Sequence, residues 1–326
     1  MKRIALIGTG QLGSRHLQGI AKLEEPFEIW LVDPDKEALS TAISRFEEIR
    51  SLNNYRGKIL TAESSRQLHG NFNLAIFACN SFQRKQAIIS FFENSNSSHL
   101  LLEKFLFPSL EDYDYINPLL NSKETKVWVN TPRRMYNSYR QLKEKITQTD
   151  NIQMTVFAGN LGLASNAIHY IDLFSFLTGL TDFEIKTDLL QKEIFESKRK
   201  GYIEFYGTIT VTGQGNQLSI TSIKSSSAPI GITIQSPDLK MLIQETQNPF
   251  MTLITDADNW QPSTSLFTMP FQSSLTNILV KDLFLNDKCN LPSYNESAKI
   301  HIALLKSFLA FYTRICDKTQ IICPIT

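Results

Sequence analysis

Continuous apolar runs, separated by segments of helical periodicity, fill the first 130 residues of the chain. Runs that are apolar throughout are typical of parallel strands covered on both faces. The strands expected from them are residues 2–8, 27–33, 58–60, 73–80, 98–104 and 126–130. The helices expected between them are residues 11–23, 33–49, 84–94 and 110–122, and the polar residues 93–98 are expected to form a loop. This alternation predicts an α/β fold with a doubly wound parallel sheet.

The pattern changes after about residue 150, where polar and apolar positions alternate. Residues 201–223 alternate around a glycine-rich turn at residues 213–216, which predicts an antiparallel hairpin. The other elements expected here are strands at residues 230–235 and 239–246 and a final helix at residues 295–315. We therefore expect two domains, residues 1–130 and residues 131–326. The second is expected to be an α+β domain built on an open antiparallel sheet.

The turn between the first strand and the first helix carries three closely spaced glycines. It consists of Gly8-Thr9-Gly10-Gln11-Leu12-Gly13. In such a turn the first glycine permits the tight bend, the second lets the backbone approach a pyrophosphate, and the third lets the helix pack close to the strand. The helix N-terminus then offers free N–H groups to the phosphates. The motif predicts a dinucleotide-binding (Rossmann) domain, with a nucleotide-free turn, a flavin site or an S-adenosylmethionine site as alternatives.

Asp33 adds a second signal for a dinucleotide. It ends the second expected strand, twenty residues after Gly13. A carboxylate at this place can accept hydrogen bonds from both ribose hydroxyls and would repel a 2′-phosphate. Since the next residues are Pro34 and Asp35 rather than an arginine, the sequence favours NAD over NADP.

The composition gives no support to several classes of function. The formal net charge is +1, which gives no electrostatic argument for binding nucleic acid or an anionic membrane. The four cysteines show no CxxC spacing and none lies near a histidine at metal-ligand spacing, so we expect reduced thiols and no metal. The apolar run at the N-terminus is too short for a signal peptide, and we expect a cytoplasmic protein.

Two further segments carry candidate chemistry. Lys104 ends an apolar strand at the carboxyl edge of the sheet, where ligands bind in open α/β folds; it is either a contact with the ligand or a solvent-facing residue. Residues 162–179 predict a helix capped by Ser165 or Asn166 and ended by Gly179. On it, His169 and Asp172 are three residues apart, so they are expected on neighbouring parts of the helix surface. His169 is either an acid/base or a core-edge histidine bonded to Asp172.

The glycine motif, Asp33, Glu103-Lys104 and the His169-x-x-Asp172 helix follow one another in an order and spacing that resemble the Gfo/Idh/MocA oxidoreductases. The resemblance covers nearly the whole chain. It implies a Rossmann domain and a C-terminal substrate and oligomerisation domain whose open sheet often mediates a homo-oligomer, a dimer or tetramer. It also implies NAD(P)-dependent hydride transfer to or from the secondary alcohol or ketone of a sugar, polyol or sugar nucleotide.

The resemblance also implies roles for individual residues. Lys104 and His169 are expected to be catalytic, with Asp172 orienting the histidine or holding a substrate hydroxyl. Asn166, Arg133 and Arg134 are expected to contact substrate. The expected cofactor contacts are Gly8, Thr9, Gly10, Gln11, Leu12, Gly13, Asp33, Cys79, Asn80, Glu103 and Lys104.

Three departures from the family pattern bear on catalysis. Phe105 follows Lys104 where the family has proline, and Arg84 lies in a region where a histidine is common. Ser165 and Ala167 replace an aspartate and a glycine ahead of the catalytic histidine. The alternative to an enzyme is therefore a non-catalytic dinucleotide-binding or sugar-binding module, a regulator with the same fold.

Overall fold

The computed structural model describes residues 1–53, 57–146 and 151–326, and its contacts divide the chain into two units. Unit 1 comprises Met1–Phe107, Glu111–Asn130 and Pro270–Tyr294. Unit 2 comprises Pro108–Leu110, Thr131–Met269 and Asn295–Thr326. A single boundary was expected after residue 130, whereas residues 270–294 pack with unit 1.

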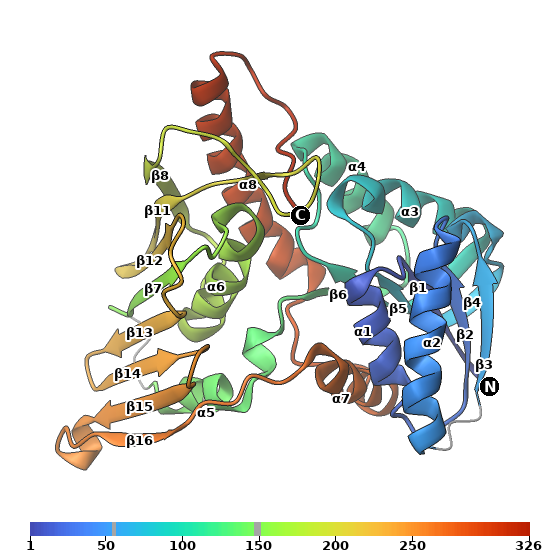
Figure 1. Cartoon of the computed structure of the whole chain (residues 1–326), viewed down its shortest axis with the longest axis horizontal. Helices are drawn as coiled ribbons and strands as arrows, with labels where there is room; N and C mark the ends of the chain where they lie inside the picture. Colours follow the sequence, from blue (N-terminus) through green and yellow to red (C-terminus); the bar gives the residue numbers. More distant parts are fainter. Residues whose placement is uncertain (54–56, 147–150) are drawn as a thin grey trace. The chain divides into compact units, whose positions relative to one another are not determined.

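Unit 1 contains a six-stranded parallel sheet in the order β3-β2-β1-β4-β5-β6 (Figure 1). Its strands are Lys2–Ile7 (β1), Phe27–Val32 (β2), Lys58–Ala62 (β3), Gly70–Phe77 (β4), Ser95–Glu103 (β5) and Lys126–Asn130 (β6). The order reverses between β1 and β4, which confirms the doubly wound sheet. The apolar runs at residues 4–6, 74–77 and 100–102 lie in the three central strands and are at most 1% exposed, as burial on both faces requires.

Helices cover this sheet and come from two distant parts of the chain. They are Gln11–Ile20 (α1), Lys36–Asn53 (α2), Ser81–Asn94 (α3), Leu110–Asn121 (α4) and Gln272–Asn286 (α7). α7 packs on α1 so closely that a Cβ atom at Gly19 would lie 2.5 Å from the carbonyl oxygen of Ser273. The sequence analysis did not foresee α7.

The loop expected at residues 93–98 is wrong. Ser95 begins β5, and residues 95–97 pair with residues 70–72 of β4. Ser95 and Ser97 are buried while Asn96 and Ser98 are exposed, and the Ser97 hydroxyl donates to the carbonyl oxygen of His99 at 2.7 Å. A serine hydroxyl that is satisfied locally, as that of Ser97 is, can occupy a buried strand position, and the polarity of the sequence does not reveal this.

Unit 2 contains an eight-stranded sheet in the order β16-β15-β14-β13-β7-β12-β11-β8. The strands are Gln153–Gly159 (β7), Glu184–Leu190 (β8), Gly207–Gly213 (β11), Asn216–Ile223 (β12), Gly231–Ser236 (β13), Leu239–Gln244 (β14), Phe250–Thr255 (β15) and Ser263–Leu266 (β16). The pairing is antiparallel except between β7 and β12, which are parallel. The expected hairpin is β11–β12, so the α+β class of this half is confirmed.

One face of this sheet is buried and the other is open. On β7, Met154, Val156 and Ala158 are buried, whereas Thr155 and Phe157 are exposed. Figure 1 shows α6 (Leu163–Thr178) and α8 (Tyr294–Cys316) along the sheet. The smaller elements of unit 2 are α5 (Asn137–Lys145), the short helical turns Pro132–Met135 and Asp256–Asp258, and the two-residue strands Phe195–Glu196 (β9) and Ile203–Glu204 (β10).

Candidate functional site

The glycine-rich turn has the close contacts that its glycines were expected to allow. Gly8 has a φ of +91°, and a Cβ atom there would overlap the backbone nitrogen of Cys79. A Cβ atom at Gly13 would overlap the carbonyl oxygen of Gly8, so α1 packs directly on the turn. These two positions are therefore restricted to glycine by the protein itself.

Gly10 differs from the other two glycines because the protein leaves it uncrowded. Apart from its chain neighbours, no atom of the described residues lies within 4 Å of a Cβ atom placed there. Gly10 is also the N-cap of α1, so the N-cap residue has no side chain that could accept a hydrogen bond from the first turn. The first turn of α1 thus directs backbone N–H groups to an open space, and this arrangement fits the pyrophosphate of a dinucleotide.

Asp33 lies beside this turn. Its Oδ2 accepts hydrogen bonds from the backbone nitrogen of Thr9 at 2.7 Å and from the Thr9 hydroxyl at 3.1 Å. Its Oδ1 accepts from the backbone nitrogen of Asp35 at 3.0 Å. These bonds hold the half-buried carboxylate next to the glycine turn. The expected contacts in this turn and Asp33 are therefore brought together in unit 1.

Glu103, expected as a cofactor contact, points its carboxylate into a buried network instead. Its Oε1 is 2.8 Å from Nε2 of His16 and accepts from Nδ2 of Asn130 at 2.5 Å. The other ring nitrogen of His16 lies 2.9 Å from the hydroxyl of Thr276 on α7. His16, on α1, and Glu103, at the end of β5, are 0% and 2% exposed. Sequence reasoning missed this network, since its members are far apart in the chain.

Lys104 follows Glu103 and is half-buried at the carboxyl end of β5, the edge where the glycine turn also lies. The peptide bond from Lys104 to Phe105 is cis. Arg84 holds the segment that follows: its guanidinium donates to the carbonyl oxygens of Phe105 and Leu106, and at 2.6 Å to that of Cys79. Arg84 is 1% exposed, so a buried cation ties the end of β4 to the residues after Lys104.

Cys79 and Asn80 follow β4 at the same edge. Burial raises the pKa of the Cys79 thiol, so it is protonated at neutral pH. The side-chain oxygen of Asn80 accepts from the backbone nitrogen of Gln83 at 3.1 Å and caps α3. Both residues are half-buried.

The start of α6 in unit 2 differs from the expectation. The helix begins at Leu163 with Gly162 as N-cap, so Ser165 and Asn166 do not cap it as expected. The carboxylate of Glu204 takes that role: it accepts from the backbone nitrogen of Ala164 at 2.5 Å and from the Ser165 hydroxyl at 2.8 Å. Burial raises the pKa of the Glu204 carboxyl. The end of α6 at Gly179, in the left-handed conformation, is as expected.

Asn166 and His169 lie on the first two turns of α6 and are both half-buried. Asn166 donates through Nδ2 to the carbonyl oxygen of Leu161 at 2.6 Å. Its side-chain oxygen is the acceptor of the amide, the group that could receive a hydrogen bond from a substrate hydroxyl.

Asp172 is bound to Arg134, a partner that its expected role beside His169 did not include. Its Oδ1 accepts from Nη2 of Arg134 at 2.7 Å, and its Oδ2 accepts from Nε at 2.9 Å. Nη1 of Arg134 donates to Glu296 at 2.9 Å. Asp172 and Arg134 are 1% and 6% exposed. This pair occupies the groups through which either residue would contact a substrate.

Arg133 is likewise part of a buried cluster in unit 2. It donates to both carboxylate oxygens of Glu245, at 3.1 Å and 2.7 Å, and to the hydroxyl of Tyr170 at 2.8 Å. The Tyr139 hydroxyl also donates to Glu245, at 2.8 Å. Burial acts to lower the pKa of Arg133, but Tyr170 and Glu245 raise it above its ordinary value, so the guanidinium is charged.

The pH dependence of stability tests the environment of Asp172. Burial raises the pKa of Asp172 from 3.8 to about 6, although Arg134 opposes the shift. Between pH 4 and 6 the unfolded state therefore loses the proton first, and the folded state loses about 3 kcal/mol as pH rises. In urea unfolding, Asp172→Asn is expected to gain that amount relative to wild type from pH 4 to pH 7. A constant difference would show that the ion pair balances burial, and a gain by wild type would show that it outweighs burial.

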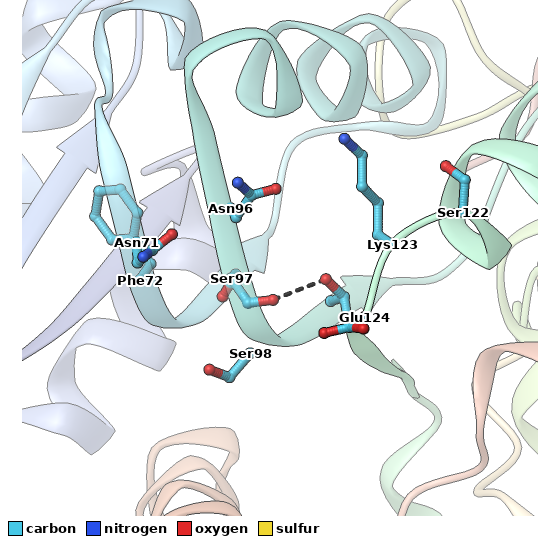
Figure 2. Close-up of a pocket in the computed structure, with 9 residues that line it drawn as sticks. Asn71, Phe72, Asn96, Ser97, Ser98, Ser122, Lys123 and Glu124 are labelled. Carbon is cyan, nitrogen blue, oxygen red and sulfur yellow. Dashed lines mark hydrogen bonds between the residues drawn. The ribbon is translucent and has the colours of Figure 1, made fainter.

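A separate pocket of about 460 Å³ lies at the amino ends of β4 and β5, the edge opposite the glycine turn. Figure 2 shows Asn96, Ser97 and Ser98 on β5, with Lys123 on the segment that follows α4. The Thr125 hydroxyl donates to the carbonyl oxygen of Ser97 at 2.8 Å. The pocket brings together none of the residues that the sequence analysis singled out.

Solved structures with the same fold cover almost the entire chain. The transcriptional regulator Gal80p from Kluyveromyces lactis aligns with a TM-score of 0.68 and 13% identity, over 99% of this chain and 94% of that chain. UDP-N-acetylglucosamine 3-dehydrogenase GnnA from Acidithiobacillus ferrooxidans aligns with a TM-score of 0.69 and 12% identity, over 96% and 98%. An Agrobacterium radiobacter oxidoreductase in complex with NAD⁺, L-tartaric acid and magnesium aligns with a TM-score of 0.69 and 13% identity, over 96% and 97%.

The resemblance to Gfo/Idh/MocA-type oxidoreductases is thus confirmed at the level of the fold. No protein-family model matches the sequence, and no curated protein matches it. Within the described ranges, no helix is long and apolar enough to cross a membrane, and no three metal-ligating side chains gather.

Proposed function

We propose that this chain is an NAD-dependent oxidoreductase that transfers a hydride between nicotinamide and a secondary alcohol or ketone of a sugar, polyol or sugar nucleotide. The observation that carries the proposal is the turn at residues 8–13. A Cβ atom at Gly8 or Gly13 would overlap backbone atoms, whereas Gly10, the N-cap of α1, is uncrowded. That combination serves an anionic ligand rather than the packing of the turn.

The residues proposed to hold the dinucleotide are all in unit 1. The backbone of residues 8–13 would receive the pyrophosphate, and Asp33 the ribose hydroxyls. Because a carboxylate repels a 2′-phosphate, Asp33 supports NAD over NADP. Cys79 and Asn80, which follow β4, and Lys104, which follows β5, would contact the cofactor at the same carboxyl edge of the sheet. Glu103 contributes indirectly, since its buried bonds to His16 and Asn130 fix the strand end that carries Lys104.

Two side chains, His169 and Lys104, are proposed for the chemistry. A bound nicotinamide supplies or accepts the hydride. His169 would remove the hydroxyl proton in oxidation or return it in reduction, because imidazole titrates near neutrality. Lys104 would stabilise the developing alkoxide with its positive charge. Asn166 is proposed to contact the substrate, whereas the pair formed by Asp172 and Arg134 is assigned a structural role.

A non-catalytic dinucleotide- or sugar-binding regulator is the second candidate. The specific observation in its favour is that Asp172 is bonded to Arg134, and that Ser165, at the start of α6, donates to the buried Glu204. One protein with the same fold, Gal80p, is described as a transcriptional regulator. Binding of NAD without turnover of any sugar, polyol or sugar nucleotide would favour this candidate.

A thermal-shift titration with NAD, NADH, NADP and NADPH tests the proposal first. A ligand that binds the folded state raises the melting temperature by mass action. We expect a rise with NAD(H) and little change with NADP(H), followed by turnover in a screen of sugars and sugar nucleotides. No rise, together with no nucleotide absorbance in the supernatant of denatured protein, would contradict the proposal.

Two alanine substitutions separate binding from folding. Gly10→Ala is expected to leave the melting temperature within about 2 °C of wild type and to weaken NADH binding about 10- to 100-fold, since the added methyl enters the space for the pyrophosphate. Gly13→Ala, in contrast, is expected both to weaken NADH binding and to lower the melting temperature, because its Cβ atom would overlap the carbonyl oxygen of Gly8. NADH fluorescence and thermal unfolding of both variants provide the measurements. Unchanged NADH binding by Gly10→Ala would contradict the site.

The open face of the unit 2 sheet is the proposed surface for a homo-oligomer. It carries exposed Phe157 on β7 and half-buried threonines on the neighbouring strands, Thr221 on β12 and Thr233 on β13. A sheet face with exposed apolar and hydroxyl side chains suits a second copy of the same face in a two-fold dimer. Light scattering of wild type and Phe157→Lys would test this: we expect dissociation of the variant.

A further inference from the structure

We propose that Arg45, on α2, belongs to the phosphate-binding site at the start of α1 and contacts the pyrophosphate of the dinucleotide. This inference rests on the proposed function and adds a side chain to a site otherwise built from backbone. Arg45 was not singled out by any sequence motif, because it lies twelve residues after Asp33 within an ordinary helix.

The first observation is where the guanidinium lies. Nη1 of Arg45 donates to Oε1 of Gln11 at 2.9 Å and to the hydroxyl of Ser14 at 3.3 Å. Gln11 is the first residue of α1 and is exposed, whereas Ser14 is 1% exposed. Arg45 itself is half-buried. A positive charge from the neighbouring helix is thus held on the first turn of α1, next to the open space at Gly10.

The second observation is the sign of the local charge. The N-terminus of a helix carries a partial positive charge, so acidic residues are favoured in its first turn and cations are not. The first turn of α1 contains no acidic residue, and the charge that reaches it from α2 is positive. The partial positive charge of the helix N-terminus and the guanidinium of Arg45 repel each other, and this repulsion costs free energy when no anion is bound. Such a local conflict is typical of a ligand site and is relieved by a bound phosphate.

The position selects the pyrophosphate over the 2′-phosphate of NADP. The partners of Arg45 are Gln11 and Ser14, both on α1, and the N–H groups of this helix point toward the pyrophosphate in the proposed site. The adenosine ribose is assigned to Asp33, whose carboxylate is bonded to Thr9 and Asp35. A guanidinium offers a planar set of donors that matches phosphate oxygens.

NADH fluorescence titrations at several salt concentrations test the inference without any substrate. Arg45→Gln is expected to weaken NADH binding about 10-fold, the loss of one charge-assisted hydrogen bond. It should also flatten the dependence of the dissociation constant on salt, because a charge has been removed from the site. Arg45→Lys should keep the salt dependence and part of the affinity. The matched control is Arg50→Gln on the same helix, which pairs with Glu47 and should bind NADH like wild type.

The possible outcomes separate this inference from the proposed function. If wild type fails to bind NADH, the proposed function is wrong. If wild type binds and Arg45→Gln has the same affinity and salt dependence, Arg45 does not belong to the site. A loss confined to NADPH would place the contact at the 2′-phosphate and overturn the inference. Equal affinities of Gln11→Ala and of the double variant Gln11→Ala/Arg45→Gln would also overturn it, because Arg45 would then only orient Gln11.

Discussion

Replacing Arg134 with methionine is expected to lower the free energy of unfolding of unit 2 by about 3–5 kcal/mol. The substitution leaves the carboxylate of Asp172, which is 1% exposed, without the two guanidinium nitrogens that it now accepts from. It also removes the bond from Arg134 to Glu296, which joins α8 to the same cluster. Urea unfolding followed by circular dichroism measures the loss.

Arg140→Met is the matched control for Arg134→Met. Arg140 is an exposed arginine on α5 in the same unit, so its loss should change stability by less than about 0.5 kcal/mol. The double variant Arg134→Met/Asp172→Asn should recover part of the loss, because it no longer buries an unpaired carboxylate. Equal stability of Arg134→Met and wild type would mean that the buried pair contributes little and that Arg134 is available to a ligand.

This pair shows why the chemistry of α6 was hard to predict. Spacing along a helix correctly indicates that residues three apart are neighbours, and this led to the expected contact between His169 and Asp172. Spacing cannot reveal a partner from another element. Arg134 lies 38 residues before Asp172, in the short helical turn after β6. The two parallel N–H donors of its guanidinium match a carboxylate better than an imidazole does.

The start of α6 was missed for the same reason. Ser165 and Asn166 are residue types that cap helices, and the expectation followed from that local preference. The cap is Glu204, 40 residues away from Ala164, whose backbone nitrogen it accepts from. Likewise α7 lies far along the chain from α1, on which it packs, and no local pattern ties the two helices together.

The features that the sequence did predict are those with local causes. A strand buried on both faces must be apolar throughout, and residues 74–77 and 100–102 are. The glycines at positions 8 and 13 are required by contacts within a single turn. The fold class and the glycine turn could therefore be predicted from the sequence. The surroundings of Asp172, Arg133 and Arg134 could not, because these side chains are bonded to residues far away in the chain.

Lys104→Ala is expected to lower turnover by a factor of about 10²–10⁴ and to change NADH affinity no more than a few-fold, because it removes the charge that is proposed to stabilise the alkoxide. Hydrogen bonds hold the chain on both sides of Lys104. Loss of the side chain should therefore leave the backbone conformation unchanged. Before this lysine, Glu103 is bonded to His16 and Asn130; after it, Arg84 binds the carbonyl oxygens of the next residues.

The measurement is the rate of NADH formation with the sugar, polyol or sugar nucleotide that wild type oxidises best, together with a fluorescence titration of NADH. Lys58→Ala serves as the control, because Lys58 is an exposed lysine at the amino end of β3, the opposite edge of the same sheet. Full turnover by Lys104→Ala would remove this lysine from the mechanism. A large loss of NADH affinity with little further loss of turnover at saturating cofactor would instead show that Lys104 binds the cofactor. The charge at the carboxyl edge of β5 would then serve cofactor binding rather than stabilisation of the alkoxide, and of the two proposed catalytic residues only His169 would remain.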